Sequence, residues 1–230
     1  MGQPLFDIPA IPNLEVIGSD NCFPVRRIFC VGRNYAAHAA EMGNEVDREA
    51  PFYFTKSAHA LVLSGAEIAY PVGTQECHYE MEFVIAIGAP THAVSQDAAM
   101  GAVYGYACGI DLTRRDLQAK AKDGRKPWDL GKDFDQSALM GAITPAAAFG
   151  EVGDQAITLE MDGVLCQSAH LSDMIWSVPE IIAHLSGFYH LMPGDLIYTG
   201  TPAGVGPVHP GAQIKGAIAG LEPIALSIAP

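Results

Sequence analysis

The sequence has few cysteines and no long apolar run. Its five cysteines are odd in number, widely spaced and never arranged as Cys-x-x-Cys, which argues against a disulfide framework or a zinc site of that type. We therefore expect free thiols in a cytoplasmic protein. No apolar run is long enough to cross a bilayer. No charged segment followed by an apolar run stands at the N-terminus, so we expect no signal peptide.

Positive charge is also scarce. There are 13 Lys and Arg residues against 26 Asp and Glu, which gives a formal net charge of −13. An acidic surface argues against nucleic acids and anionic membranes as partners. An anionic substrate would need a metal ion or a local cluster of Arg and Lys to be held. Apolar residues make up 49% of the 230 residues, which is enough for a sizeable core and leaves little room for disorder.

Two glutamates stand just before an apolar, β-branched run. His78, Glu80 and Glu82 alternate along the chain, so on a strand they should point to one face. Two carboxylates about 7 Å apart along a strand repel each other unless a cation lies between them. The strand-like run 104–111 ends in a third carboxylate, Asp111. Such ligands suit Mg²⁺ or Mn²⁺, with Ca²⁺ as a substitute; the alternative is an exposed polar strand face.

The remaining pattern is one of many short strands and a few short helices. It predicts an α+β fold in which strands dominate. Residues 1–25 are rich in proline and predict an N-terminal arm, and residues 26–230 predict a single catalytic domain. The predicted strands include 27–32, 51–56, 144–149, 157–161 and 196–201. The predicted helices are 36–42, 95–104, 113–122 and 177–187. A strand or hairpin is predicted at 57–69 and a polar loop at 128–137.

The segment 35–50 joins a short helix pattern to a polar stretch. His38 and Glu41 are three residues apart and should share one face of that helix. A helix of this length is marginal unless it packs against other elements. We therefore expect a lid that closes over bound substrate and brings both side chains to it.

Taken together, several motifs resemble the fumarylacetoacetate hydrolase family. The resemblance spans residues from about 26 to 220 and is strongest for short members that cleave acylpyruvates. It implies a mixed β-sandwich-like roll of the C-terminal domain type, a bound Mg²⁺ or Mn²⁺, and a homodimer. The motifs are Cys30-Val-Gly-Arg-Asn-Tyr35 with His38 and Glu41, Glu80-x-Glu82, Gly109-Ile-Asp111, Arg115-Asp116, Lys132 and Tyr198-Thr-Gly-Thr-Pro-Ala-Gly-Val-Gly206.

The resemblance also implies roles for single residues. It assigns no metal ligand to Cys77, which alternates away from Glu80, and favours an indirect or structural role for His78. Lys56 is left between a role in the site and a role in the fold. The implied residues are Glu80, Glu82 and Asp111 for the metal, His38, Glu41 and Lys132 for catalysis, and Arg33, Arg115, Gln118 and Thr201 for substrate binding.

The implied activity is hydrolysis of a carbon–carbon bond in a 2,4-diketo acid. Fumarylpyruvate, an intermediate of gentisate breakdown, is the first expectation, with fumarate and pyruvate as products. Decarboxylation of oxaloacetate or isomerisation of 2-hydroxyhepta-2,4-diene-1,7-dioate would use the same metal without attack by water. A carboxylate-binding protein is the non-enzyme alternative, but it has no need of a proton-transfer pair such as His38 and Glu41. The residues at the distal end of the substrate lie on loops that the sequence does not place.

Overall fold

The computed structural model describes residues 5–7, 9–41, 43 and 48–230. Strands dominate it and the helices are short, as the sequence predicts. The largest sheet consists of β3 (Arg27–Gly32), β4 (Phe52–Lys56), β5 (Leu61–Leu63), β8 (Met81–Ile87), β9 (Val103–Asp111), β11 (Ala138–Met140), β12 (Thr144–Pro145) and β15 (Asp195–Tyr198). Its order is β4-β3-β15-β8-β9-β11-β5, and β12 pairs with β9.

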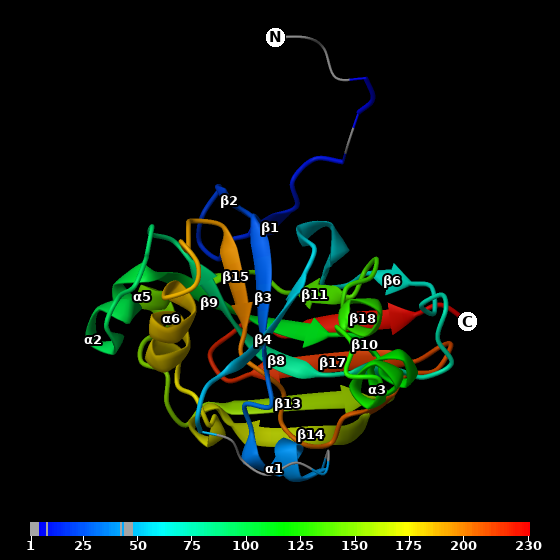
Figure 1. Ribbon diagram of the computed structural model, residues 1–230. Coiled ribbons are helices and arrows are strands. Elements are labelled where there is room, and N and C mark those ends of the chain that lie inside the picture. Colours follow the sequence, from blue (N-terminus) through cyan, green and yellow to red (C-terminus); the bar gives the residue numbers. More distant parts are fainter. Residues whose placement is uncertain (1–4, 8, 42, 44–47) are drawn as a thin grey trace.

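A second sheet lies beside the first (Figure 1). Its strands are β6 (Glu67–Ile68), β13 (Ala156–Met161), β14 (Val164–His170), β17 (Gln213–Ile218) and β18 (Ile224–Ile228), in the order β14-β13-β17-β18-β6. Two small sheets complete the strands: β10 (Thr113–Arg114), β7 (Cys77–Tyr79) and β16 (Gly206–Pro207) form one, and β1 (Asn13–Glu15) and β2 (Cys22–Pro24) form the other.

Short helices lie around the rims of these sheets (Figure 1). They are α1 (Ala36–Glu41), α2 (Gln96–Ala99), α3 (Arg115–Asp123), α4 (Asp129–Lys132), α5 (Ala146–Phe149) and α6 (Val178–Ser186), with single 3₁₀ turns η1 (Ala58–Ala60), η2 (Met100–Ala102) and η3 (Leu171–Asp173). Helix α6 begins as predicted, with a capping box between Ser177 and Glu180. In the described part of the chain, none of the helices is long and apolar enough to cross a membrane.

Strand β8 is buried on both faces, and this fixes the register of the site. Met81, Phe83 and Ile85 face the second sheet and join its apolar core. Val84 and Ala86 point the other way, into a second apolar cluster with β3 and β15. Because a slip of one residue would exchange the two faces, the packing determines which side chains of β8 point toward the second cluster. Glu82 shares the face of Val84.

Three sequence predictions were wrong in detail. Residues 144–149 form a two-residue strand followed by α5 rather than one strand, because three successive alanines favour a helix. The predicted loop 128–137 contains α4. The segment 57–69 forms no hairpin, because β5 pairs with β11 and β6 pairs with β18 in the other sheet.

Candidate active site

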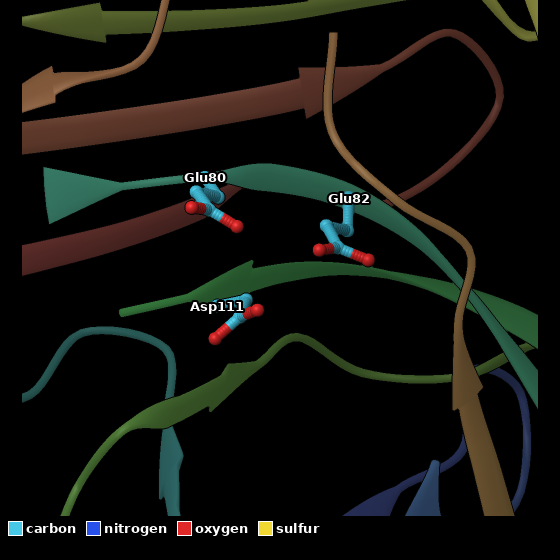
Figure 2. Close-up of side chains that lie close together, drawn as sticks. All are labelled: Glu80, Glu82 and Asp111. Atoms are coloured by element: carbon cyan, nitrogen blue, oxygen red, sulfur yellow. The ribbon is translucent and has the colours of Figure 1, made fainter. Parts of the chain in front are cut away.

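Three buried carboxylates converge where β8 begins and β9 ends. One oxygen from each of Glu80, Glu82 and Asp111 lies within 4.8 Å of the others. Figure 2 shows Glu80 and Glu82 from one strand segment facing Asp111 on the neighbouring one. The antiparallel pairing of β8 with β9 produces this arrangement, since the Asp111 amide donates to the carbonyl of Glu80 at 2.9 Å. The three side chains are at most 6% exposed.

Three buried cations surround the carboxylates. Lys132 Nζ lies 2.7 Å from both Glu80 Oε2 and Asp111 Oδ2, and it also donates to Thr113 Oγ1 at 2.7 Å. Arg115 Nη2 donates to Glu80 Oε1. Lys56 Nζ lies 2.8 Å from Asp111 Oδ1 and donates to the carbonyl of Lys132. The cations offset the repulsion between carboxylates, which would otherwise oppose folding.

These contacts shift the pKa values of the two glutamates in opposite directions. Burial alone would raise the pKa of Glu80, but Lys132 and Arg115 hold it well below its usual value. Burial raises the pKa of Glu82, and the charges of Asp111 and Glu80 raise it further. Burial would lower the pKa of Lys132, yet Asp111 and Glu80 raise it above its usual value, so the ammonium is charged at neutral pH.

The donor set suits a hard divalent cation. All three groups offer oxygen, and Mg²⁺ and Mn²⁺ prefer oxygen ligands. In the described part of the chain, Asp111 Oδ1 is buried and accepts no hydrogen bond, although it forms an ion pair with Lys56. Glu82 accepts one short hydrogen bond, from the Gly200 amide at 2.6 Å. Both carboxylates therefore retain capacity to bind a cation.

Changing Glu82 to glutamine is expected to weaken metal binding. Glutamine has the shape of the protonated carboxyl, so the fold should tolerate it, but one ligand charge is lost. Even groups that only support a metal ligand cost about 10–100-fold in affinity when removed, so the Kd for Mn²⁺ should rise at least about tenfold in a calorimetric titration. Glu76→Gln is the control, because Glu76 is exposed and pairs with His78. An unchanged titration would remove Glu82 from the ligands.

Gly200 positions its amide for Glu82 in a turn that excludes other residues. Its φ is +96°, in the region that favours glycine. A Cβ there would also lie 2.8 Å from the Cβ of Asn34. Gly109, opposite Glu82 on β9, is restricted as well, since a Cβ would lie 2.6 Å from Val84 and 2.7 Å from Tyr198.

The pair expected to handle water lies on α1. His38 Nδ1 is 3.0 Å from Glu41 Oε2, and the Glu41 carboxylate accepts the Gly204 amide at 3.1 Å. His38 is 7% exposed and lines the same cleft as Glu80. Of the expected lid 35–50, residues 42 and 44–47 lie outside the described residues, so closure on substrate stays a prediction.

The four expected substrate-binding residues line this cleft too. Arg115 donates to Gln118 Oε1 at 2.7 Å, and both are nearly buried. Thr201 Oγ1 accepts from Gln167 Nε2 at 2.8 Å, and Gln167 also binds the Met81 amide on β8. Arg33 is exposed and also lines the cleft. The structure thus brings together every residue of the expected site.

Other residues of the site were missed or left open. Lys56, which the resemblance left between a role in the site and a role in the fold, is fully buried against Asp111. Lys122, Phe54 and Trp128 also line the cleft, but nothing in their local pattern marks them. His78 is outside the carboxylate cluster in the described residues and contacts Arg115 at 3.4 Å, which fits an indirect role.

Comparison with known proteins places the chain among enzymes of one family. Residues 27–228 match the model of the fumarylacetoacetate (FAA) hydrolase C-terminal family. A fumarylpyruvate hydrolase of Ralstonia sp is 52% identical over 192 residues, which is 82% of this chain and 99% of that protein. An oxaloacetate tautomerase of Escherichia coli is 37% identical over 193 residues, or 84% and 88% of the two chains.

A solved structure agrees over almost the whole length. The crystal structure of fumarylpyruvate hydrolase from Pseudomonas aeruginosa, in complex with Mn²⁺ and pyruvate, superimposes with a TM-score of 0.95 at 46% identity and covers 99% of each chain. A match of this extent, together with the carboxylate cluster on β8 and β9, shows that the chain belongs to the fumarylacetoacetate hydrolase family.

Proposed function

We propose that this protein is a metal-dependent hydrolase that cleaves the carbon–carbon bond of an acylpyruvate, with fumarylpyruvate as its main substrate. The observation that carries the proposal is that Glu80 and Glu82 of the carboxylate cluster line one cleft together with His38 and Lys132. The 52% identity to a fumarylpyruvate hydrolase supports the choice of substrate. The products would be fumarate and pyruvate.

The carboxylate cluster would hold Mg²⁺ or Mn²⁺. When bound, this ion supplies Lewis-acid polarisation of the 2-keto acid end of the substrate. Arg115, Gln118 and Thr201 are placed along the same cleft with polar atoms, where they would bind and orient the substrate's nearer carboxylate. Arg115 is itself fixed by Glu80 and Gln118, so its guanidinium is already oriented before substrate binds.

His38 would act as the general base on water. Its Nδ1 is held by Glu41, which leaves Nε2 to accept the proton and lets the carboxylate stabilise the imidazolium that forms. The hydroxide would attack the 4-keto carbon. Lys132, charged and within the cleft, would stabilise the oxyanion that develops. The bond to the pyruvyl carbon then breaks, and protonation of that carbon gives pyruvate.

The test is a substrate panel with the Mn²⁺-loaded enzyme. Fumarylpyruvate, acetylpyruvate and oxaloacetate are supplied in turn and pyruvate release is measured. We expect fumarylpyruvate to give the highest kcat/KM. Equal or faster turnover of oxaloacetate would overturn the proposal in favour of the activity for which relatives such as the Escherichia coli protein are named. Decarboxylation would be measured as pyruvate release, and tautomerisation, which releases no pyruvate, as loss of the absorbance of the enol form. No turnover of any compound would favour a binding protein.

We further propose that a cytoplasmic homodimer of this chain acts in breakdown of aromatic compounds, with residues 26–230 as the catalytic unit. The dimer surface must lie elsewhere than the apolar tail, since Ile224, Leu226 and Ile228 are buried within the chain. Exposed apolar side chains on other elements, such as Phe52 and Leu63, are better candidates. A mass near 24.4 kDa by light scattering at micromolar concentration would contradict the dimer.

A further inference from the structure

The cleft has two cations that its own carboxylates do not neutralise. Arg33 and Lys122 line it together with Glu80 and Glu82. Arg115 and Lys132 form ion pairs with Glu80, whereas neither Arg33 nor Lys122 has an ion pair with a carboxylate among residues 5–7, 9–41, 43 and 48–230. Burial lowers the pKa of Lys122, and the positive charges of Arg115 and Arg33 lower it further. Two like charges therefore lie close together in an otherwise acidic protein.

The backbone holds Arg33 in an unfavourable conformation. Its φ is +58°, a left-handed value that is uncommon for residues other than glycine. Asn34 fixes the turn, since its side chain donates to the carbonyl of Thr199 at 2.8 Å and accepts the Trp176 amide at 2.6 Å. Strain of this kind persists where the surroundings impose it and is concentrated at binding sites. The turn therefore fixes where the Arg33 side chain leaves the backbone.

Lys122 lies against aromatic side chains at the cleft. It lies in the last turn of α3, and its Nζ is 5.1 Å from the centre of the Trp128 ring. Trp128 meets the ring of Phe52 edge-on, with centroids 4.9 Å apart. Phe54, with its ring 4.8 Å from Lys132 Nζ, lines the cleft as well. Aromatic rings of the cleft thus lie beside both Lys122 and Lys132.

We propose that Arg33 and Lys122 bind the distal carboxylate of a dicarboxylic acylpyruvate, while Phe54 and Trp128 contact its unsaturated middle. The inference rests on the proposed function and adds the residues that choose among acylpyruvates. Fumarylpyruvate carries one carboxylate at each end, and its trans double bond keeps the second one away from the metal cluster. Charge-assisted hydrogen bonds would hold that group.

The same pair would select against shorter or uncharged substrates. Acetylpyruvate ends in a methyl group, which would leave the two cations partly desolvated and without an anion, and this is unfavourable. Oxaloacetate carries its two carboxylates on a four-carbon chain, whereas fumarylpyruvate has seven carbons, so the second carboxylate of oxaloacetate would reach less far from the metal. The cleft would therefore prefer a long dianion over both compounds.

The kinetic test compares two variants with a matched control. Lys122→Met keeps the length of the side chain and removes its charge, and Arg33→Asn suits the left-handed backbone. Each should lower kcat/KM for fumarylpyruvate at least about tenfold, chiefly through KM, because a charge-assisted hydrogen bond is lost. Turnover of acetylpyruvate should not fall, since it makes no such bond, and should rise where an unpaired charge in the cleft is removed. Lys120→Met, an exposed position on the same helix, should leave both substrates unchanged.

A binding test separates this inference from the proposed reaction. 2-Oxoheptanedioate and 2-oxoheptanoate share the chelating end and differ only in the distal carboxylate. Calorimetry with the Mn²⁺-loaded protein should show tighter binding of the dioate, and Lys122→Met and Arg33→Asn should each reduce the difference. Equal binding of both acids to the unmodified protein, or a preference that survives both substitutions, would overturn the inference. Failure to hydrolyse fumarylpyruvate with the preference intact would overturn the proposed reaction alone.

Discussion

Replacing His38 with glutamine is expected to lower kcat for fumarylpyruvate by about 10²–10⁴-fold, the usual contribution of a positioned general base. Glutamine can still donate a hydrogen bond to Glu41, so α1 should keep its position, but it cannot take a proton from water. Affinity for Mn²⁺ should be unchanged, because His38 lies outside the carboxylate cluster. The loss should therefore appear in turnover while the metal site stays intact.

Two further variants separate chemistry from structure. His59→Gln is the matched control, since His59 is exposed on η1 and is no part of the cleft. Glu41→Gln keeps an acceptor for the Gly204 amide and removes the charge beside the imidazole, so it should lower kcat by less than the loss of His38. Full activity of His38→Gln would show that another group activates water.

The strands near the site could be predicted from the sequence because apolar side chains occupy both of their faces. The run from Phe83 to Ile87 is apolar throughout, as a strand buried on both faces requires. The short helix 36–41 and the capping box at Ser177 also followed local rules. Segment 57–69 failed because β5 and β6 pair with strands distant in the sequence, which the local pattern does not show. Segment 144–149 failed because the helix propensity of its three successive alanines was not taken into account.

The same distinction holds for the site: side chains that are close in the sequence could be placed together, but contacts between distant segments could not be predicted from local patterns. The spacing of Glu80 and Glu82 predicts two converging carboxylates, but only the pairing of β8 with β9 brings Asp111 to them. The motifs that resemble the family supplied Lys132, whose neighbours would otherwise suggest a polar loop. The role of Lys56 stayed open because it arises from an ion pair with the distant Asp111. Lys122 could not be predicted, because its role arises from the shape of the cleft.

Replacing Lys132 with methionine is expected to abolish most turnover and to destabilise the metal-free protein. The ammonium lies 2.7 Å from Glu80 and from Asp111, with its side chain 3% exposed. Its removal leaves two buried carboxylates without their shared cation. Breaking a buried ion pair by deleting one partner costs about 3–5 kcal/mol. Because the folded pKa of Lys132 is raised, its stabilisation is complete at neutral pH and would be lost only above the ordinary lysine range.

Denaturant unfolding with and without metal tests this expectation. In the presence of a metal chelator, the Lys132→Met variant should unfold at a clearly lower denaturant concentration than the unmodified protein. The Lys215→Met variant, changed on the exposed face of β17, should unfold at the same concentration as the unmodified protein. Added Mn²⁺ should restore more stability to the variant, because a ligand that binds only the folded state stabilises it and the variant has more uncompensated negative charge to satisfy. Turnover should stay low even when Mn²⁺ saturates the variant, since the group that faces the oxyanion is missing. A variant that unfolds like the unmodified protein in chelator would show that Lys56 and Arg115 alone neutralise the cluster, and normal turnover would remove Lys132 from the reaction.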